Sequence, residues 1–165
     1  MDKHVIKQIL EYAQLLSTAH RVLDGTETTT KSKTGRNVKR WQLTDEREDV
    51  LYSATHINHP SAVWVRKSQS NYIWLYNLWR QLMIEYTYRY GKNHACEKLI
   101  DSLCIVPHNI PDGVFTEPTP AMPDEVKIKG SSIASYRNYY LNNKTHLAAW
   151  KNRPIPNWFV ENNIN

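Results

Sequence analysis

The stretch NYIWLYNLWRQLMIEYTYRY, residues 71–90, decides the fold, because its apolar side chains cover most of the circumference of a helix. A helix that is apolar on most sides is buried on most sides, so this stretch predicts the central helix of the domain. Ser68 or Ser70 precedes it as a candidate N-cap, and Gly91 marks its end. The apolar positions are Trp74, Leu75, Leu78, Trp79, Leu82, Met83 and Tyr86.

Other segments carry weaker helical patterns. Residues 2–23 repeat apolar side chains at helical spacing and stop at Asp24-Gly25, which predicts a long amphipathic helix. Further helices are expected over 45–54, over 95–103 and over 131–150. We therefore expect an all-α fold, a single compact domain of about four to five helices with long irregular loops.

Three segments lack a helical pattern. Residues 26–44 are rich in lysine and arginine and are expected to form a mobile basic loop. Residues 105–130 hold a cluster of prolines and predict a rigid loop across the surface, and residues 151–165 predict an extended C-terminal tail. The whole chain, 1–165, is long enough for one hydrophobic core and is expected to be one domain.

Composition narrows the function classes. With 21 basic and 16 acidic residues the chain has a formal charge of +5, which favours a polyanionic partner, and nucleic acid is the first such partner to consider. No apolar run has the length of a membrane span and no signal-peptide pattern begins the chain, so we expect a cytoplasmic protein without membrane contact. Cys96 and Cys104 fit neither a disulfide framework nor a zinc site, and are expected to be reduced and packed. No nucleotide-binding, zinc-protease or serine-hydrolase motif is present, and we expect no cofactor and no metal.

The first predicted helix carries a candidate catalytic group. His4, Lys7 and Glu11 lie at positions i, i+3 and i+7, so they share one helix face. One explanation is an ordinary surface ion pair between Lys7 and Glu11. The other is a catalytic carboxylate, Glu11, surrounded by basic groups that bind phosphates.

Two further clusters are candidate phosphate contacts. Lys31, Lys33 and Arg36 lie in the basic loop, which is either a solvated connector or an arm that orders on nucleic acid. His56 and His59 precede the central helix, with Arg66 shortly after them. Two histidines without an evident third ligand favour a structural or phosphate-binding role over a metal site.

The remaining candidate nucleic-acid-binding residues lie at the end of the central helix and in the C-terminal third of the chain. Glu85 and Arg89 are spaced for an intrahelical salt bridge, and Lys92 follows the helix as a phosphate candidate. Aromatic and cationic side chains alternate near the C-terminus, a composition that suits DNA grooves and extruded bases as well as ordinary core packing. From this region we take as nucleic-acid-binding candidates Arg137, Tyr140, Lys144 and Trp158.

These pieces together resemble the phage pyrimidine-dimer DNA glycosylase (endonuclease V) family and its less characterised phage relatives. The segment DKHVIKQILE places Asp2, His4 and Glu11 at the intervals of that family's first helix. The stretch from INHPSAVW to IEYTYRYGK resembles its histidine-containing turn and long helix, and RPIPNWF resembles its C-terminal tail. The resembling stretches cover more than half of the chain.

The resemblance implies a DNA glycosylase with associated AP lyase activity on damaged or modified bases in duplex DNA, placed in the host cytoplasm if phage-encoded. In that family the N-terminal α-amine attacks C1′ of the sugar and forms a Schiff base, and the glutamate, here Glu11, stabilises the developing charge. Along a continuous helix the amine of Met1 lies about 15 Å from Glu11. Two alternatives therefore stay open: a non-catalytic DNA-binding protein of the same fold, and a helical partner-binding protein.

Overall fold

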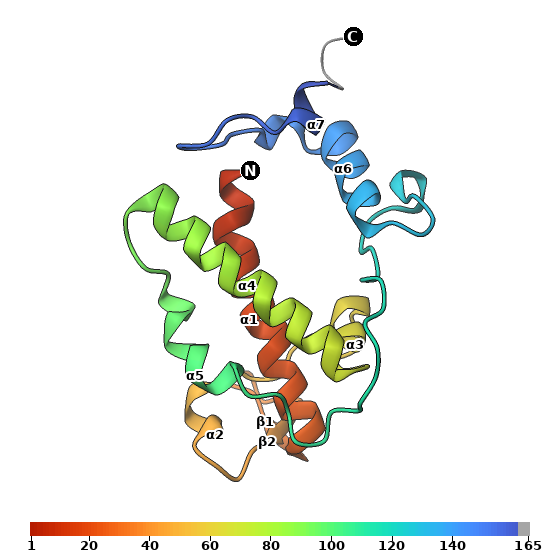
Figure 1. The fold of residues 1–165 in the computed structure, drawn as a ribbon. Coiled ribbons are helices and arrows are strands. Elements are labelled where there is room, and N and C mark those ends of the chain that lie inside the picture. The colour runs from red at the N-terminus through yellow and green to blue at the C-terminus, as the bar shows by residue number, and fades with distance from the viewer. Residues whose placement is uncertain (162–165) are drawn as a thin grey trace.

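The structure is a computed structural model that describes residues 1–161. Two long helices, α1 (Asp2–Asp24) and α4 (Gln69–Tyr90), pack against each other and form the centre of the molecule (Figure 1). Their contact buries Trp79 completely, and its indole Nε1–H donates to the carbonyl oxygen of Ile9 at 3.0 Å. The central helix predicted at 71–90 is thus confirmed, as are its Ser68 N-cap and its left-handed C-cap at Gly91.

The expected all-α class is wrong, because a two-stranded antiparallel sheet follows α1. Strand β1 (Thr26–Lys31) pairs with β2 (Asn37–Gln42) in the register Thr26↔Gln42 to Lys31↔Asn37. The segment predicted as a loop at 26–44 is therefore mostly a hairpin. Its threonines are β-branched and favour strands, and Gly35 supplies the positive φ of 77° that its turn requires.

The number and length of the helices also differ from expectation. In addition to α1 and α4, the described residues form α2 (Arg47–Val50), α3 (Pro60–Val65), α5 (Ile100–Leu103), α6 (Ser132–Asn143) and α7 (Asn157–Val160). Single 3₁₀ turns occupy η1 (Ala95–Leu99), η2 (Asp124–Val126) and η3 (Thr145–Leu147). Pro60 is the first residue of α3, a position where a helix needs no N–H donor.

The buried Arg21 fastens the hairpin and α2 to α1. Arg21, of which 5% is exposed, donates to the carbonyl oxygens of Trp41, Glu48, Leu51 and Tyr52. Its guanidinium also binds the Glu48 carboxylate at 2.6 Å. Buried polar groups must be paired, so these contacts fix the path of residues 41–52 around α1.

The proline-rich segment between α5 and η2, residues 104–123, crosses the N-terminal end of α4, and we call it the strap. Asn71 bonds the strap residue Thr116 through both its amide group and its carbonyl oxygen. At the other end of the strap, the Asp24 carboxylate accepts the backbone N–H groups of His108 and Asn109. These bonds hold a segment that has no regular structure between α5 and η2.

The strap leads to a C-terminal lobe, residues 124–161, which contains η2, α6, η3 and α7. Figure 1 shows this lobe beside the N-terminal end of α1, away from α5 and the hairpin. Asp2 joins the two parts: its backbone N–H donates to Ala149, and its carboxylate accepts from Lys151 and Arg89. Part of the predicted tail is helical as α7, and residues 162–165 of that tail lie outside the described residues.

Both cysteines are free, but only Cys96 is buried; Cys104 is exposed, contrary to expectation. Within residues 1–161, every helix is too short or too polar to cross a bilayer.

Candidate functional site

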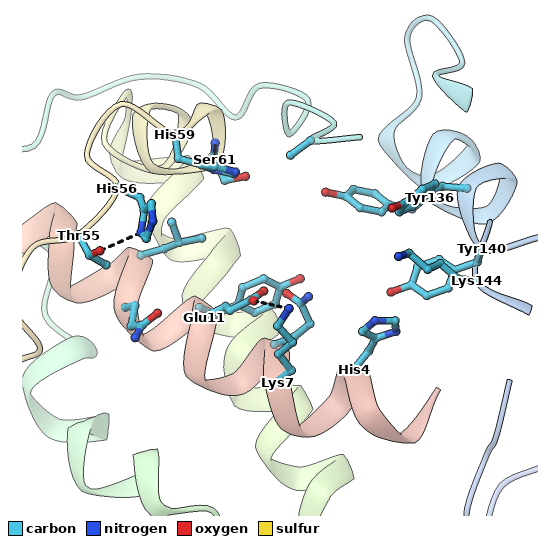
Figure 2. A pocket seen from close by; sticks show the side chains of 16 residues that line it. His4, Lys7, Glu11, Thr55, His56, His59, Ser61, Tyr136, Tyr140 and Lys144 are labelled. Atoms are coloured by element: carbon cyan, nitrogen blue, oxygen red, sulfur yellow. Dashed lines mark hydrogen bonds and ion pairs between the residues drawn. The ribbon is translucent and has the colours of Figure 1, made fainter. Parts of the chain in front are cut away.

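A cavity of about 670 Å³ opens between α1, the segment before α3, and α6 (Figure 2). Its volume falls in the range of ligand-binding clefts. The lining residues come from four parts of the chain that are far apart in sequence: α1, residues 55–61, the proline-rich segment, and α6 with Lys144. They are His4, Lys7, Gln8, Glu11, Tyr12, Gln14, Leu15, Thr55, His56, His59, Ser61, Ala121, Tyr136, Tyr139, Tyr140 and Lys144. We call this space the polar cavity.

Glu11 is the single acidic residue among those that line the polar cavity. Its carboxylate lies 3.3 Å from the ammonium group of Lys7, one helical turn earlier, and the two side chains are 40% and 69% exposed. The second lysine of the cavity, Lys144, belongs to the C-terminal lobe. Two lysines around one carboxylate give the lining a net positive charge, which favours an anionic ligand.

His4 lies on α1 where the C-terminal lobe covers it. Its ring packs edge to face on Tyr140, with ring centroids 5.2 Å apart. Burial lowers the pKa of His4, and the positive charges of the Met1 amine, Lys144 and Lys7 lower it further. The ring is therefore mostly neutral at neutral pH. Its Nδ1 is buried without a hydrogen-bond partner in the described part of the chain.

His56 has a backbone conformation that is unusual for a residue with a side chain. Its φ is 47°, in the left-handed region, where non-glycine residues are strained. Figure 2 shows its ring at the edge of the cavity, where Nδ1 lies 2.8 Å from the Thr55 hydroxyl. Strain of this kind persists where the surrounding structure holds a residue in place, and it is common at ligand sites.

His59 has a structural task as well. It is the N-cap of α3, and its Nδ1 accepts the backbone N–H of Ser61 at 3.2 Å. With Nδ1 occupied as an acceptor, the neutral ring carries its proton on Nε2 and donates from that atom. This N-cap contact is a structural role, which is one of the two roles expected of His59, and phosphate binding by it stays a prediction.

One face of α6 forms the opposite wall. Tyr136 and Tyr140 are four residues apart, and Lys144 follows after four more, just past the helix end. Burial, with Tyr136 as the next cause, raises the pKa of Tyr140 to about 12, so its hydroxyl stays protonated and can donate. The Lys144 ammonium lies over the Tyr139 ring, 5.2 Å from its centroid.

The α-amine of Met1 lies close to this site but outside its lining. About half buried, it has a pKa below the usual value, lowered first by desolvation and then by Arg89. Its charge acts on His4, which places it on the side of the cavity where the lobe meets α1. A larger share of this amine is therefore unprotonated at neutral pH than of an ordinary chain terminus.

The structure brings together seven of the predicted site residues and leaves seven outside the polar cavity. The polar cavity contains Glu11, His4, Lys7, His56, His59, Tyr140 and Lys144. Lys31, Lys33 and Arg36 lie in and around the turn of the hairpin, which follows the C-terminal end of α1 in the chain. Asp24 is the last residue of α1, directly before the hairpin, and it lies about 20 Å from Glu11 along the helix. This distance is the length of about six base pairs of duplex DNA.

Four predicted residues have other surroundings. Arg66 is partly buried and donates to the carbonyl oxygen of Ile57 at 2.9 Å, so one of its tasks is to hold the loop before α3. Lys92 is exposed past the end of α4. Arg137 lies over the ring of Trp158, 5.6 Å from its centroid, and both line a second cavity next to the first. The predicted Glu85–Arg89 salt bridge is confirmed at 2.7 Å.

Sequence reasoning missed nine of the lining residues, among them Tyr12, Thr55, Ser61 and Tyr136. The i, i+4 spacing of Tyr136 and Tyr140 and the position of Tyr12 next to Glu11 were signals that could have found two of them. Thr55 and Ser61 become neighbours of Glu11 only through the fold. In residues 1–161, no group of three histidine, cysteine or acidic side chains is arranged to hold a metal ion.

Comparisons of the chain with protein-family models, with curated proteins and with solved structures find no match. The functional interpretation therefore depends on the site itself.

Proposed function

We propose that this protein is a DNA glycosylase that acts on a nucleotide extruded from a duplex, with Glu11 as its catalytic carboxylate and with associated AP lyase activity. The observation that carries the proposal is the position of Glu11, a lone carboxylate in a cavity whose other charged groups are cations. Enzymes that act on a base must take it out of the stack into such a pocket. The resemblance of the first helix to the pyrimidine-dimer glycosylases supports the same assignment.

The cationic groups suit the DNA backbone. Lys7, Lys144 and the donating Nε2 of His59 line the space beside Glu11, where they bind the phosphates that flank an extruded nucleotide. His4 and His56 add ring nitrogens as donors or acceptors. The formal charge of +5 raises the concentration of DNA near the whole molecule.

The reaction needs an unprotonated amine near C1′ of the sugar. The amine nitrogen bonds to C1′ as the bond from C1′ to the base breaks, and the base leaves with that electron pair and takes up a proton. The amine then loses a proton and the sugar ring opens, which gives the imine. The Glu11 carboxylate stabilises the positive charge that develops on the sugar.

Three amines are candidates for the nucleophile. The α-amine of Met1 has the pKa that suits attack, because burial and Arg89 both favour its neutral form. Lys7 has the position, since its ammonium lies 3.3 Å from the Glu11 carboxylate, and Lys144 faces them across the cavity. Peptide mapping of a trapped adduct distinguishes the three.

The variant Glu11→Gln tests the role of the carboxylate. It keeps the size of the side chain and removes the charge, so we expect turnover on abasic and ultraviolet-irradiated duplex DNA to fall at least about 100-fold. Affinity for the same DNA should stay within about threefold. The matched control is Glu97→Gln, which changes charge equally and lies outside the cavity. Unchanged turnover in Glu11→Gln would rule out the catalytic role.

A second candidate function is non-catalytic DNA binding by the same surface. It is favoured by the Lys7–Glu11 ion pair, which is an ordinary i, i+4 contact between exposed side chains, and by the absence of Met1 from the cavity lining. This alternative predicts salt-sensitive binding with no base release and no imine. The two functions therefore differ in a covalent product.

A further inference from the structure

A second cavity of about 310 Å³ lies beside the polar cavity and has a different character. Its walls include Leu15, Trp64, Trp74, Leu78, Ile133 and Trp158. We call it the aromatic chamber. Tyr12, Leu15, Ser61, Tyr136 and Tyr140 line both spaces, so the two are neighbours that share a wall.

Large apolar side chains are left open to solvent in this chamber. Trp74 is 40% exposed and Ile133 is 64% exposed. Trp74 lines the chamber from α4 of the main body, and Ile133 lines it from α6 of the C-terminal lobe. Exposed apolar surface in a concave site that adjoins polar groups is typical of a binding site.

The aromatic walls are held in place by contacts of their own. Trp64 packs edge to face on Trp74, with ring centroids 5.7 Å apart. The Trp64 indole N–H donates to both the carbonyl oxygen and the hydroxyl of Thr116 in the strap. Phe115 packs against both indoles and is not among the residues that line the chamber. The rings are thus supported in the absence of any ligand.

We propose that the aromatic chamber binds the planar ring of a nucleobase, while the sugar and phosphate of the same nucleotide lie in the polar cavity. The proposal rests on the proposed function, which assigns the polar cavity to an extruded nucleotide. Indole and phenol rings stack on any base, because every base has a π-face. An aliphatic chain would fill the chamber equally well but would leave the adjoining lysines and histidines without a partner.

The six tryptophans supply an internal control for a direct test. Trp64, Trp74 and Trp158 line the aromatic chamber, whereas Trp41, Trp79 and Trp150 line neither cavity. We would label the indole nitrogens with ¹⁵N, assign their NMR signals by single Trp→Phe variants, and titrate 2′-deoxyadenosine 5′-monophosphate. The signals of the first three tryptophans should shift, and those of the other three should stay.

Two comparison ligands distinguish binding of the nucleobase from binding of the sugar phosphate and of a protein side chain. 2-Deoxyribose 5-phosphate lacks the base and should leave the three chamber indoles unmoved. Equal shifts with both ligands, or no shift with the nucleotide at millimolar concentration, would overturn the proposal. Larger shifts with N-acetyltryptophanamide than with the nucleotide would also overturn it, because they would assign the chamber to a protein side chain.

A matched pair of variants tests the stacking wall. Trp74→Leu removes one ring face and keeps an apolar residue, so nucleotide affinity should fall about tenfold. Phe115→Leu alters the same aromatic cluster at a residue that does not line the chamber, and it should change affinity less than twofold. Similar effects of the two variants would contradict a direct contact.

The outcomes for the chamber and for the proposed function are independent. Nucleotide-dependent shifts without base release would support base binding in the aromatic chamber and exclude glycosylase activity. Base release that depends on Glu11, together with unmoved chamber indole signals, would exclude base binding in the aromatic chamber and support glycosylase activity.

Discussion

Arg153 of the C-terminal lobe binds the Glu85 carboxylate near the end of α4, with N–O distances of 2.7, 3.0 and 3.2 Å. The same carboxylate accepts a hydrogen bond from Arg89, of which 7% is exposed, and Arg89 in turn binds Asp2. This chain of charges holds the lobe against α1 and α4. Because α6 is one wall of the polar cavity, the ion pairs fix the width of the site.

Removal of Glu85 should loosen that attachment. Glu85→Ala leaves the buried Arg89 with Asp2 alone, so the free energy of unfolding should fall by about 2 kcal/mol. The strap should also become more susceptible to limited proteolysis. Arg153→Gln keeps the Glu85–Arg89 pair and should lower the free energy of unfolding by less than Glu85→Ala does. Equal stability of Glu85→Ala and the parent protein in urea denaturation would show that these charges do not hold the lobe.

His20 should make the fold sensitive to acid. It is fully buried, and burial, with Arg47 as the next cause, lowers its pKa from 6.5 to about 4. Its Nδ1 lies 2.9 Å from the Arg47 guanidinium, an acceptor role that a protonated ring cannot fill. The unfolded chain takes up a proton below about pH 6.5 and the folded chain does not, so stability falls as pH falls.

The size of this effect is measurable between pH 7 and pH 5, where most carboxylates stay ionised. The parent protein should lose about 2 kcal/mol more than His20→Gln over that interval. The test is the difference between the two pH values, because the substitution itself also changes stability. An identical pH dependence in both proteins would show that His20 is not kept neutral by the fold.

The hairpin should contribute to DNA binding through phosphates alone. Replacing Lys31, Lys33 and Arg36 with glutamine should weaken binding at all sequences and reduce the slope of log affinity against log salt by about 2 to 3. The matched control replaces Lys67, Lys98 and Lys129, which carry the same charge outside the hairpin and both cavities. If both triple variants have the same slope, the hairpin is a solvated connector.

The sequence was sufficient for the parts of the fold that local patterns determine. Ser68 and Gly91 bracket an apolar run, and the structure places the helix between them. The hairpin was missed because its lysines and arginines suggested a solvated loop, although four of the six residues from Thr26 to Lys31 are threonines, which favour strands. A basic composition indicates that a segment is exposed to solvent, but it does not determine the secondary structure of that segment.

The candidate site divides in the same way. His4, Lys7 and Glu11 share a helix face, so their spacing alone placed them together. Tyr136 and Lys144 meet them only because the strap and the Asp2 contacts bring the C-terminal lobe to α1, more than 120 residues away in the sequence. No local pattern encodes that approach. The left-handed backbone of His56 is likewise a result of its tertiary surroundings.

The most direct test of the central claim is borohydride trapping on abasic and ultraviolet-irradiated duplex DNA. We expect a covalent protein–DNA adduct with the parent protein, much less adduct with Glu11→Gln, and a modified peptide that contains Met1, Lys7 or Lys144. Salt-sensitive binding without any adduct, at equal DNA occupancy, would contradict the glycosylase assignment and leave a non-catalytic DNA-binding protein.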